Sequence, residues 1–279
     1  MIDPRRYPCN GRVAHESLKG QVEGVRFVPG QLMQVGVPVA GLFMEPKTSL
    51  ARQMMFGEGF LVLENDPETD YSYGQCVFDD YAGYIKSDEL MATYVATHKV
   101  KRLNTHIYPE ADMKTVPLMT LPMGALLDVV YVKDGFGALA TGGFIPAQAI
   151  GVLDDYAEDM VSVAEEFMGT AYLWGGDSYQ GIDCSGLVQT SLRNCGQACP
   201  RDSDIQQAEV GTEFGDNTPL RRGDLVFWKS HVGIMMDETM LLHANAHHMR
   251  VITEPLADVA ARILKTEGLE IACRRRLNQ

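Results

Sequence analysis

The sequence has few positive charges and no long apolar run. Its 24 Lys and Arg residues stand against 37 Asp and Glu residues, which gives a net charge of −13 at pH 7. A chain this acidic repels nucleic acids and anionic cell-envelope polymers, so we expect neither as a partner. A substrate with a positive group suits it better. No stretch approaches the roughly 20 apolar residues of a membrane span, so no membrane partner is expected.

The N-terminus also lacks the apolar segment of a secretory signal peptide, since it reads Met-Ile-Asp-Pro-Arg-Arg-Tyr-Pro-Cys-Asn. The sequence as it stands therefore predicts a cytoplasmic protein. In that reducing compartment six cysteines are expected to be free thiols: Cys9, Cys76, Cys184, Cys195, Cys199 and Cys273. Cys195 and Cys199 form C-x3-C, but no second cysteine pair lies nearby to complete a zinc site. We expect no metal and no other cofactor.

The pattern of hydrophobic residues divides the chain into four segments. Residues 1–32 mix proline, glycine and charge, and we interpret them as a lead-in that packs on the body of the protein. Residues 33–92, and again 93–152, contain short apolar runs separated by turn residues, which is typical of small antiparallel β barrels. Residues 153–279 begin with helical periodicity and end in strands, which predicts an α+β domain.

Two pairs of similar motifs indicate an internal duplication of the barrels. Met55-Phe-Gly-Glu-Gly-Phe-Leu is similar to Leu121-Pro-Met-Gly-Ala-Leu-Leu, and Ala82-Gly-Tyr-Ile is similar to Gly142-Gly-Phe-Ile. The succession of strand, glycine turn, strand and then Gly-aromatic-Ile resembles the bacterial SH3-like module. The resemblance implies two such modules in tandem.

One cysteine follows a glycine-rich aromatic loop and stands where a helical pattern begins. The loop runs over residues 171–183, and Leu187 and Val188 continue the helical pattern after Cys184. A thiol at a helix N-terminus meets the positive end of the helix dipole and unpaired N–H groups, which favour the thiolate. Cys184 is therefore a candidate nucleophile, although a lone cysteine is more often a buried apolar residue.

A cysteine nucleophile needs a base within hydrogen-bond reach and a group that orients the base. His231 and His243 lie at or inside predicted strands, twelve residues apart. A hairpin between residues 232–236 and 240–243 makes these two histidines plausible neighbours. The remaining histidines are interpreted as surface or core residues: His15, His98, His106, His247 and His248. Of these, His247 and His248 lie close enough to the expected site to contact a substrate.

Four motifs resemble the signature of the NlpC-type cell-wall cysteine peptidases: Tyr172-Leu-Trp-Gly-Gly, Gly181-Ile-Asp-Cys-Ser-Gly-Leu-Val, Arg222-Gly-Asp-Leu-Val-Phe-Trp and His231-Val-Gly-Ile. The resemblance covers about residues 153–279. It implies a papain-like core with permuted connectivity. The expected fold class is therefore α+β, with two small SH3-like barrels followed by a cysteine peptidase domain.

The resemblance implies a role for individual residues. Carried over position by position, Cys184 is the nucleophile, His231 the general base and His243 the polar residue that orients the base. The backbone N–H of Cys184 is the natural oxyanion donor. The resemblance also implies that the Tyr172 hydroxyl assists there, with a core tyrosine as the equal alternative.

Two SH3-like modules ahead of such a domain resemble the γ-D-glutamyl-L-diamino acid endopeptidases of murein recycling. These take free peptides with an unblocked L-Ala N-terminus, such as L-Ala-γ-D-Glu-meso-diaminopimelate. The resemblance implies that Asp202 and Ser203 grip the substrate ammonium and so reject acylated or glycan-linked peptides. The alternative for Asp202 is an N-cap of the helix expected over Asp204–Val210.

The predicted substrate-binding residues are seven: Tyr81, Tyr172, Trp174, Asp183, Ser185, Asp202 and Ser203. Tyr81 would come from the first barrel, with Tyr84 as its alternative. Asp183 is more readily a structural cap for the helix that begins at Cys184. Arg222 and Asp224 are interpreted as loop-to-strand structure.

Other functions remain open. An envelope peptidoglycan hydrolase would use the SH3-like modules to bind the wall, but the net charge of −13 and the missing export signal argue against it. An acyltransferase or amidase of the same fold would use the acyl-cysteine differently, and the Cys–His–His set does not separate it from a peptidase. A non-catalytic binding module is disfavoured by the intact set.

Overall fold

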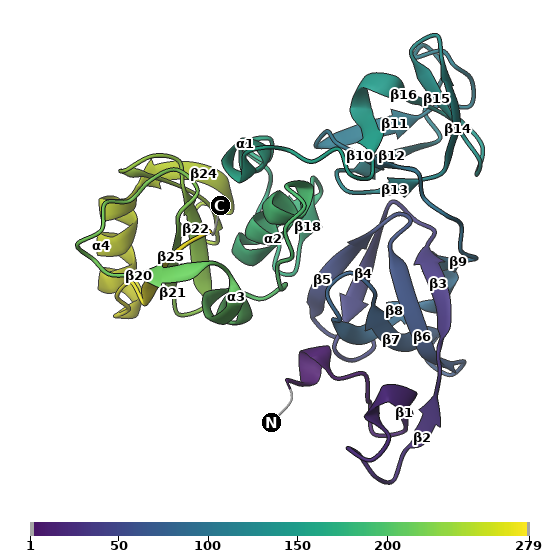
Figure 1. Cartoon of the computed structure of the whole chain (residues 1–279), viewed down its shortest axis with the longest axis horizontal. Helices are drawn as coiled ribbons and strands as arrows, with labels where there is room; N and C mark the ends of the chain where they lie inside the picture. Colours follow the sequence, from purple (N-terminus) through teal and green to yellow (C-terminus); the bar gives the residue numbers. More distant parts are fainter. Residues whose placement is uncertain (1–2, 278–279) are drawn as a thin grey trace. The chain divides into compact units, whose positions relative to one another are not determined.

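The structure, a computed structural model, describes residues 3–277 and divides into two compact units (Figure 1). The first unit is Met1–Asp155 and the second is Tyr156–Gln279. The first consists mainly of strands, whereas the second combines helices with a six-stranded sheet. Within residues 3–277 no helix is long and apolar enough to cross a membrane.

A short lead-in packs on the first barrel. Its elements are η1 (Pro4–Arg6), β1 (Val13–His15), η2 (Glu16–Leu18) and β2 (Arg26–Val28). β1 and β2 pair in parallel. Val13 is buried in one cluster with Tyr71, Tyr73 and Tyr84 of the barrel, so the lead-in shares apolar contacts with it.

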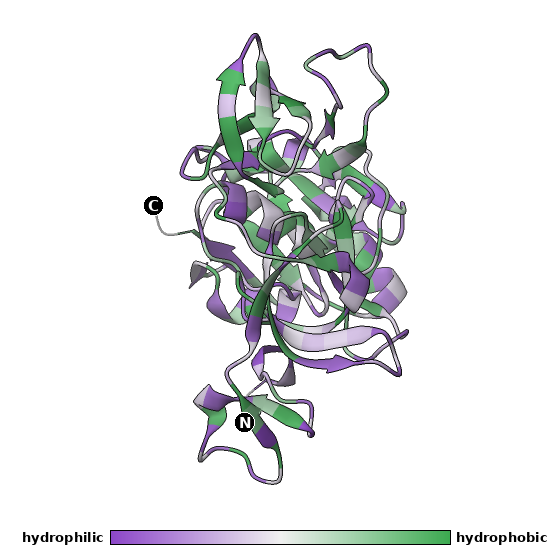
Figure 2. Ribbon diagram, turned by 90° about the vertical axis from the view of Figure 1, so that its right-hand side faces the viewer, coloured by the Kyte–Doolittle hydropathy of each residue, from purple (hydrophilic) through white to green (hydrophobic). Residues whose placement is uncertain are grey.

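Seven strands form one antiparallel sheet in the first barrel, in the order β5-β4-β8-β7-β6-β3-β9. They are β3 (Gln31–Val35), β4 (Val39–Phe43), β5 (Leu50–Met55), β6 (Gly59–Asp66), β7 (Tyr71–Cys76), β8 (Ala82–Lys86) and β9 (Leu90–Met91). Alternate side chains close a core that contains Val35, Phe60, Tyr81 and Ile85. Figure 2 shows hydrophobic residues concentrated along the strands.

Three small sheets follow, in the orders β13-β10-β17, β11-β12 and β14-β15-β16. Their strands are β10 (His98–Val100), β11 (Asn104–Ile107), β12 (Met119–Pro122), β13 (Leu126–Leu127), β14 (Val129–Lys133), β15 (Phe136–Leu139), β16 (Phe144–Pro146) and β17 (Ile150–Val152). Val100, Leu121, Leu127 and Ile145 are central to a second core. These strands therefore enclose a core of their own.

The two barrels repeat the same local structure. In the first, β8 is followed by the 3-10 turn η3 (Ser87–Glu89) and β9, and in the second β16 is followed by η4 (Ala147–Ala149) and β17. The glycines of the two similar turn motifs, Gly57 and Gly124, have φ of 80° and 83°, a region that favours glycine. Local geometry thus agrees with the duplication indicated by the sequence.

The second unit contains α1 (Met160–Glu165), β18 (Asp177–Ser178), β19 (Gly181–Ile182), α2 (Cys184–Asn194), α3 (Ser203–Glu209), β20 (Thr212–Phe214), β21 (Leu225–Trp228), β22 (His231–Met235), β23 (Met240–Asn245), β24 (Arg250–Pro255), α4 (Leu256–Glu267) and β25 (Cys273–Arg276). Its sheet is antiparallel, in the order β20-β25-β21-β22-β23-β24. Val259 and Ile263 of α4 pack on the sheet, and α2 contacts β22 and β23. In Figure 1 the sheet lies between α4 and α2.

The first helix of this unit is shorter than the periodicity of residues 154–168 predicts. Asp159 accepts hydrogen bonds from the N–H groups of Val161 and Ser162 and caps α1 at Met160. Tyr156 therefore lies outside the helix, where it is 51% exposed. A capping side chain five residues into the acidic run sets the start of the helix.

Sequence periodicity locates the strands β21 to β24 within one or two residues, but it misses α4 and β20. The α4 segment has only two fully buried side chains, Val259 and Ile263, so its apolar stripe is narrow. It ends at Gly268, whose φ of 71° is left-handed.

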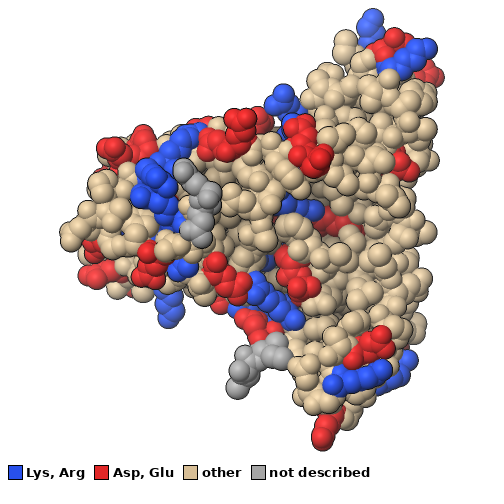
Figure 3. All heavy atoms as spheres, viewed as in Figure 1, with Lys and Arg blue, Asp and Glu red and all other residues tan. Residues whose placement is uncertain are grey.

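Acidic and basic side chains are interspersed on the face of the molecule that Figure 3 shows. Arg12 pairs with Glu64 and Arg276 with Asp224, each at 2.7 Å. Each of these contacts neutralises one acidic side chain with one basic side chain.

Candidate active site

Cys184 is the first residue of α2, and Asp183 is its N-cap. The Gly186 N–H donates to Asp183 Oδ1 at 2.7 Å, and the Gly175 N–H donates to Oδ2 at 2.8 Å. The expected cap is confirmed. One carboxylate therefore holds both the glycine loop and the first turn of the helix, and it fixes the position of the nucleophile between them.

A buried arginine braces this carboxylate. Arg201, whose side chain is 1% exposed, donates to Asp183 at 2.9 Å and through Nε to Asp177 at 3.0 Å. It also donates to Ser185 Oγ at 2.8 Å and to the Gly176 carbonyl at 3.2 Å. Two carboxylates around one guanidinium satisfy the buried charge, so the loop and the helix start form one rigid network.

The same network brings α3 to the start of α2. The Gln206 side-chain amide donates to the carbonyls of Ser185 and Pro200, each at 2.9 Å. Asp202 and Ser203, at the start of α3, therefore belong to the segment attached to the nucleophile helix. Asp202 occupies the N-cap position, but its side chain makes no capping hydrogen bond. α3 thus begins directly after Asp202, as expected if Asp202 is the N-cap, but the side-chain hydrogen bond of an N-cap is not formed.

His231 and His243 are neighbours, as the hairpin predicts. β22 and β23 pair antiparallel, and His231 Nε2 lies 2.9 Å from His243 Nδ1. His243 is 1% exposed, and its Nε2 lies 3.0 Å from Glu254 Oε2 and 3.0 Å from Asn245 Nδ2. His231, His243 and Glu254 therefore form a hydrogen-bonded chain that reaches from β22 to β24, with His243 in the middle.

The Cys184 sulfur lies against the backbone that follows His231. It accepts a hydrogen bond from the N–H of Val232 and another from the N–H of Ser185. Of the two ring nitrogens of His231, Nε2 contacts His243, so Nδ1 is the nitrogen that this contact leaves open. The chain thus brings Cys184, His231 and His243 together.

The expectation of a favoured thiolate is wrong for the protein without substrate. Burial raises the pKa of the Cys184 thiol, and the charge of Asp183 raises it further, against the lowering effect of the N–H groups of Val232 and Ser185. Burial also lowers the pKa of His231, as does the neighbouring His243. The pair is therefore a neutral thiol beside a neutral imidazole, which is suited to general-base activation.

Tyr172 lies close enough to Cys184 for the two side chains to interact electrostatically. Burial raises the pKa of its hydroxyl, and so does the nearby Cys184 thiol, so the hydroxyl keeps its proton and can donate it in a hydrogen bond. Trp174, in the same loop, is 65% exposed. Among residues 3–277 the Cys184 N–H donates to no protein acceptor.

The other predicted contacts are placed as follows. Ser185 Oγ donates to Asp183 Oδ1 at 3.1 Å and accepts from Arg201, so its side chain belongs to the bracing network. Tyr81 packs in the core of the first barrel, where it is 5% exposed. Tyr84 is also buried and accepts a hydrogen bond from Asn10 Nδ2. A contact of Tyr81 with substrate stays a prediction.

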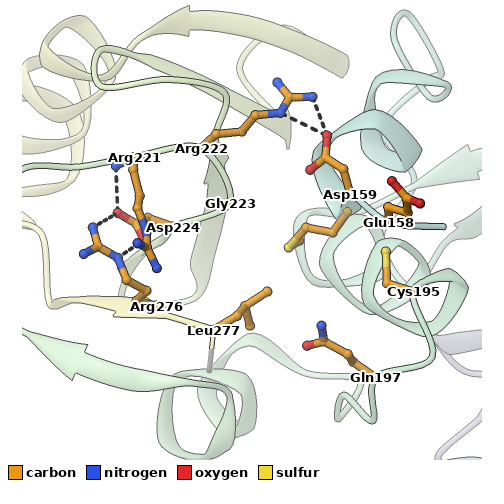
Figure 4. Close-up of a pocket in the computed structure, with 11 residues that line it drawn as sticks. Glu158, Asp159, Cys195, Gln197, Arg221, Arg222, Gly223, Asp224, Arg276 and Leu277 are labelled. Atoms are coloured by element: carbon orange, nitrogen blue, oxygen red, sulfur yellow. Dashed lines mark hydrogen bonds and ion pairs between the residues drawn. The ribbon is translucent and has the colours of Figure 1, made fainter. Parts of the chain in front are cut away.

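The second unit has a cavity of about 290 Å³ whose lining does not include Cys184, His231 or His243 (Figure 4). In Figure 4, Arg276 and the Arg221 N–H surround Asp224, and Arg222 reaches Asp159. These contacts join the loop before β21 to β25 and to the start of α1. Arg222 and Asp224 therefore have the structural role that the sequence indicates.

Within residues 3–277 no cluster of three or more His, Cys, Asp or Glu side chains is arranged to hold a metal ion. Cys199 is buried and Cys195 is half-buried.

Sequence reasoning missed the residues that support the site. Arg201 stands directly before Asp202, and two aspartates in a glycine-rich buried loop signal the need for a cation. Glu254 faces Leu241 in the β23–β24 register and is the diagonal neighbour of His243, so only the register identifies it.

Two regions match known protein families. Residues 169–263 match the NlpC/P60 family, and residues 42–90 match the bacterial dipeptidyl-peptidase Sh3 domain. Cys184, His231 and His243 all lie inside the first of these regions. The expected fold class is confirmed: SH3-like barrels precede a papain-like peptidase domain.

Individual proteins are similar over different lengths. Dipeptidyl-peptidase 6 of Lysinibacillus sphaericus is 25% identical over 233 residues, which cover 74% of this chain and 85% of that protein. Gamma-D-glutamyl-L-lysine dipeptidyl-peptidase of Bacillus subtilis is 34% identical over 97 residues, which cover 32% of each protein. The chain thus spans about a third of the length of that relative.

A solved structure of an NlpC/P60 family protein from Bacillus cereus superposes with a TM-score of 0.72. The superposition covers 88% of this chain and 99% of that one at 19% identity. At this identity the likeness shows a shared fold.

Proposed function

The chain belongs to the NlpC/P60 family of cell-wall cysteine peptidases, and we propose that it cleaves the γ-D-Glu–diamino acid bond of murein peptides with a free N-terminal L-Ala. The observation that carries the proposal is the pairing of the Cys184–His231–His243 constellation with an acidic residue, Asp202, at the start of α3. The name of the Bacillus subtilis relative supports the bond, since it specifies a γ-D-glutamyl-L-lysine linkage.

In the proposed reaction the Cys184 sulfur attacks the scissile carbonyl while its proton passes to His231. His231 then protonates the leaving amine, the C–N bond breaks, and an acyl-enzyme remains. His231 next takes a proton from water as the water oxygen adds to the acyl carbon, and the S–C bond then breaks as His231 returns a proton to the Cys184 sulfur. Tyr172 and the Cys184 N–H donate to the oxyanion, because both are donors close to the sulfur and the N–H lacks a protein acceptor among residues 3–277.

Specificity for a free amine comes from Asp202 and Ser203 in this proposal. A carboxylate that faces an ammonium gains a charge-assisted hydrogen bond, and an acylated amine leaves that carboxylate without its ion pair. Trp174, which is 65% exposed, is proposed to pack against the peptide.

The first barrel (residues 33–92) is proposed to supply Tyr81 for substrate contact, and the second (residues 93–152) to complete the N-terminal part. We place the reaction in the cytoplasm, since peptides released from the wall are its proposed substrate. The net charge of −13 suits such small peptides better than anionic wall polymers.

The test incubates the full chain with L-Ala-γ-D-Glu-meso-diaminopimelate and with its N-acetylated form, and follows products by mass spectrometry. We expect L-Ala-γ-D-Glu from the free peptide alone. Cys184→Ala abolishes the reaction, and Cys195→Ala, at the other end of α2, preserves it. Equal turnover of both peptides contradicts the amine requirement. Cleavage of intact peptidoglycan in preference to either peptide contradicts the substrate class.

A further inference from the structure

A carboxylate behind the two histidines is held by an unusual number of donors. Arg262 donates to both oxygens of Glu254, at 2.5 Å and 2.8 Å. His248 Nε2 lies 3.2 Å from Oε1, and His243 Nε2 lies 3.0 Å from Oε2. Although burial raises the pKa of Glu254, hydrogen bonds from Arg262, His243 and His248 lower it to about 2. Glu254 is therefore an anion at neutral pH.

We propose that Glu254, held by Arg262, is a positioning residue that keeps the proton of His243 on Nε2 and so determines which nitrogen of His231 receives the Cys184 proton. The inference rests on the proposed function for its chemistry. It assigns a positioning role to Glu254, to Arg262 and to Nε2 of His243, the ring nitrogen that does not contact His231.

The argument begins at the contact between Glu254 and His243. A carboxylate oxygen 3.0 Å from an imidazole nitrogen needs a proton between them, because two facing lone pairs repel. Glu254 is ionised, so that proton is on Nε2 of His243. Since burial lowers the pKa of His243, the ring is neutral and its Nδ1 carries a lone pair.

The contact between His243 and His231 makes the protonation of His231 depend on that of His243. His243 Nδ1, as an acceptor, requires the proton of His231 on Nε2, because these atoms are 2.9 Å apart. The lone pair of His231 is then on Nδ1, the ring nitrogen that the His243 contact leaves open. The N–H of the next residue, Val232, binds the Cys184 sulfur. His231 therefore presents an unprotonated ring nitrogen, which can accept the proton of the Cys184 thiol.

One residue opposes this arrangement. Asn245 Oδ1 accepts from the His248 N–H at 2.8 Å, which turns the amide Nδ2 toward His243 Nε2 at 3.0 Å. If that contact dominated, His243 would be protonated on Nδ1 and His231 would present an N–H to the thiol. A hydrogen bond to a full carboxylate charge is roughly twice as strong as one between neutral groups, so Glu254 prevails.

The proton balance is simple. On attack, the proton of the thiol moves to His231 Nδ1 as the S–C bond forms and the carbonyl electron pair moves to oxygen. The imidazolium of His231 is stabilised through His243 by Glu254 and is opposed by Arg262. The titratable groups that act on the pair are Glu254 of β24, Arg262 of α4 and His248 of the turn between β23 and β24.

The first test observes the tautomers directly and needs no substrate. Long-range ¹H–¹⁵N spectra of the full chain with ¹⁵N-labelled histidine, assigned with His231→Asn and His243→Asn, should show both rings protonated on Nε2. Glu254→Gln should give His243 a mixed tautomer, whereas Glu267→Gln, at the exposed end of α4, should change nothing. A wild-type His243 protonated on Nδ1 overturns the proposal.

The second test separates positioning from a purely structural role. The rate of Cys184 alkylation by iodoacetamide, read by peptide mass spectrometry, should fall about tenfold in Glu254→Gln, the effect of one pKa unit. It should also fall in Arg262→Met, but by less, because Glu254 then keeps its charge and loses only the guanidinium that holds it. An unchanged rate in Glu254→Gln, or a larger fall in Arg262→Met than in Glu254→Gln, overturns the proposal. If these results hold while no murein peptide is cleaved, the proposed function fails and this inference stands.

Discussion

Arg201 donates to Asp183 at 2.9 Å from a position where the side chains of both residues are less than 10% exposed. The contact joins the residue before the predicted ammonium-binding aspartate to the residue before the predicted nucleophile. Because Asp177 contacts the same guanidinium, one buried cation orders the loop, the α2 start and the α3 start. The catalytic geometry therefore depends on an ion network that takes no part in the proposed chemistry.

We expect Arg201→Met to destabilise the second unit by about 3–5 kcal/mol, the cost of leaving buried carboxylates without their partner. Urea unfolding followed by tryptophan fluorescence measures this, since both tryptophans, Trp174 and Trp228, lie in that unit. Arg222→Met is the matched control. Its ion pair with Asp159 is 41% exposed on the arginine side, so a loss below about 1 kcal/mol is expected. Equal losses in the two variants would contradict the network's importance.

Gly186→Ala should destabilise the same unit by about 1–3 kcal/mol and lower the activity, because overpacking forces a shift of the nucleophile helix. A Cβ at Gly186 would lie 2.3 Å from the Gly176 carbonyl oxygen and 2.7 Å from Asp177 Oδ1. Gly215→Ala is the control, since a Cβ there meets nothing within 4 Å. Urea midpoints of the two variants, with peptide turnover beside them, check the prediction. A Gly186→Ala midpoint at the wild-type value would refute it.

Asp202→Asn should reduce kcat/KM for the free peptide by about 10- to 100-fold, as expected for the loss of a hydrogen bond to a charged group worth about 1.5–3 kcal/mol. The preference over the N-acetylated peptide should shrink by the same factor. Asp204→Asn, in the first turn of the same helix, controls for a change in helix charge. Steady-state kinetics on both peptides provide the measurement, and an unchanged preference in Asp202→Asn would assign the ammonium to another residue.

The pH profile should reflect the burial of His231. Its lowered pKa means that the neutral, proton-accepting ring persists as pH falls below the ordinary value of 6.5. We expect kcat/KM to change less than about twofold between pH 7 and pH 5, whereas a base with an ordinary histidine pKa would lose roughly 25-fold. Initial rates across this range, in buffers of constant ionic strength, decide between the two. The folded state should also lose stability as pH falls below 6.5, because the unfolded chain then binds a proton that folded His231 does not.

The parts of the site that depend on residues close in sequence could be predicted from the sequence. The helix start at Cys184 and its cap at Asp183 are set by neighbouring residues, since a capping side chain reaches only the next turn. The hairpin that pairs His231 with His243 is likewise local, since the two residues are twelve positions apart in the sequence. Contacts of this kind depend on the spacing of residues along the chain, so they can be predicted from the sequence.

The sequence by itself therefore determined the order of the segments, the candidate nucleophile and its two histidines. Tertiary structure decided the rest. The register of β23 against β24 places Glu254 behind His243, and burial of Arg201 between Asp177 and Asp183 fixes the loop. Burial also reversed the ionisation expected of Cys184, because the desolvation of a charge exceeds the help of a helix terminus. Register and solvent exclusion arise only when distant segments meet, so no local pattern records them.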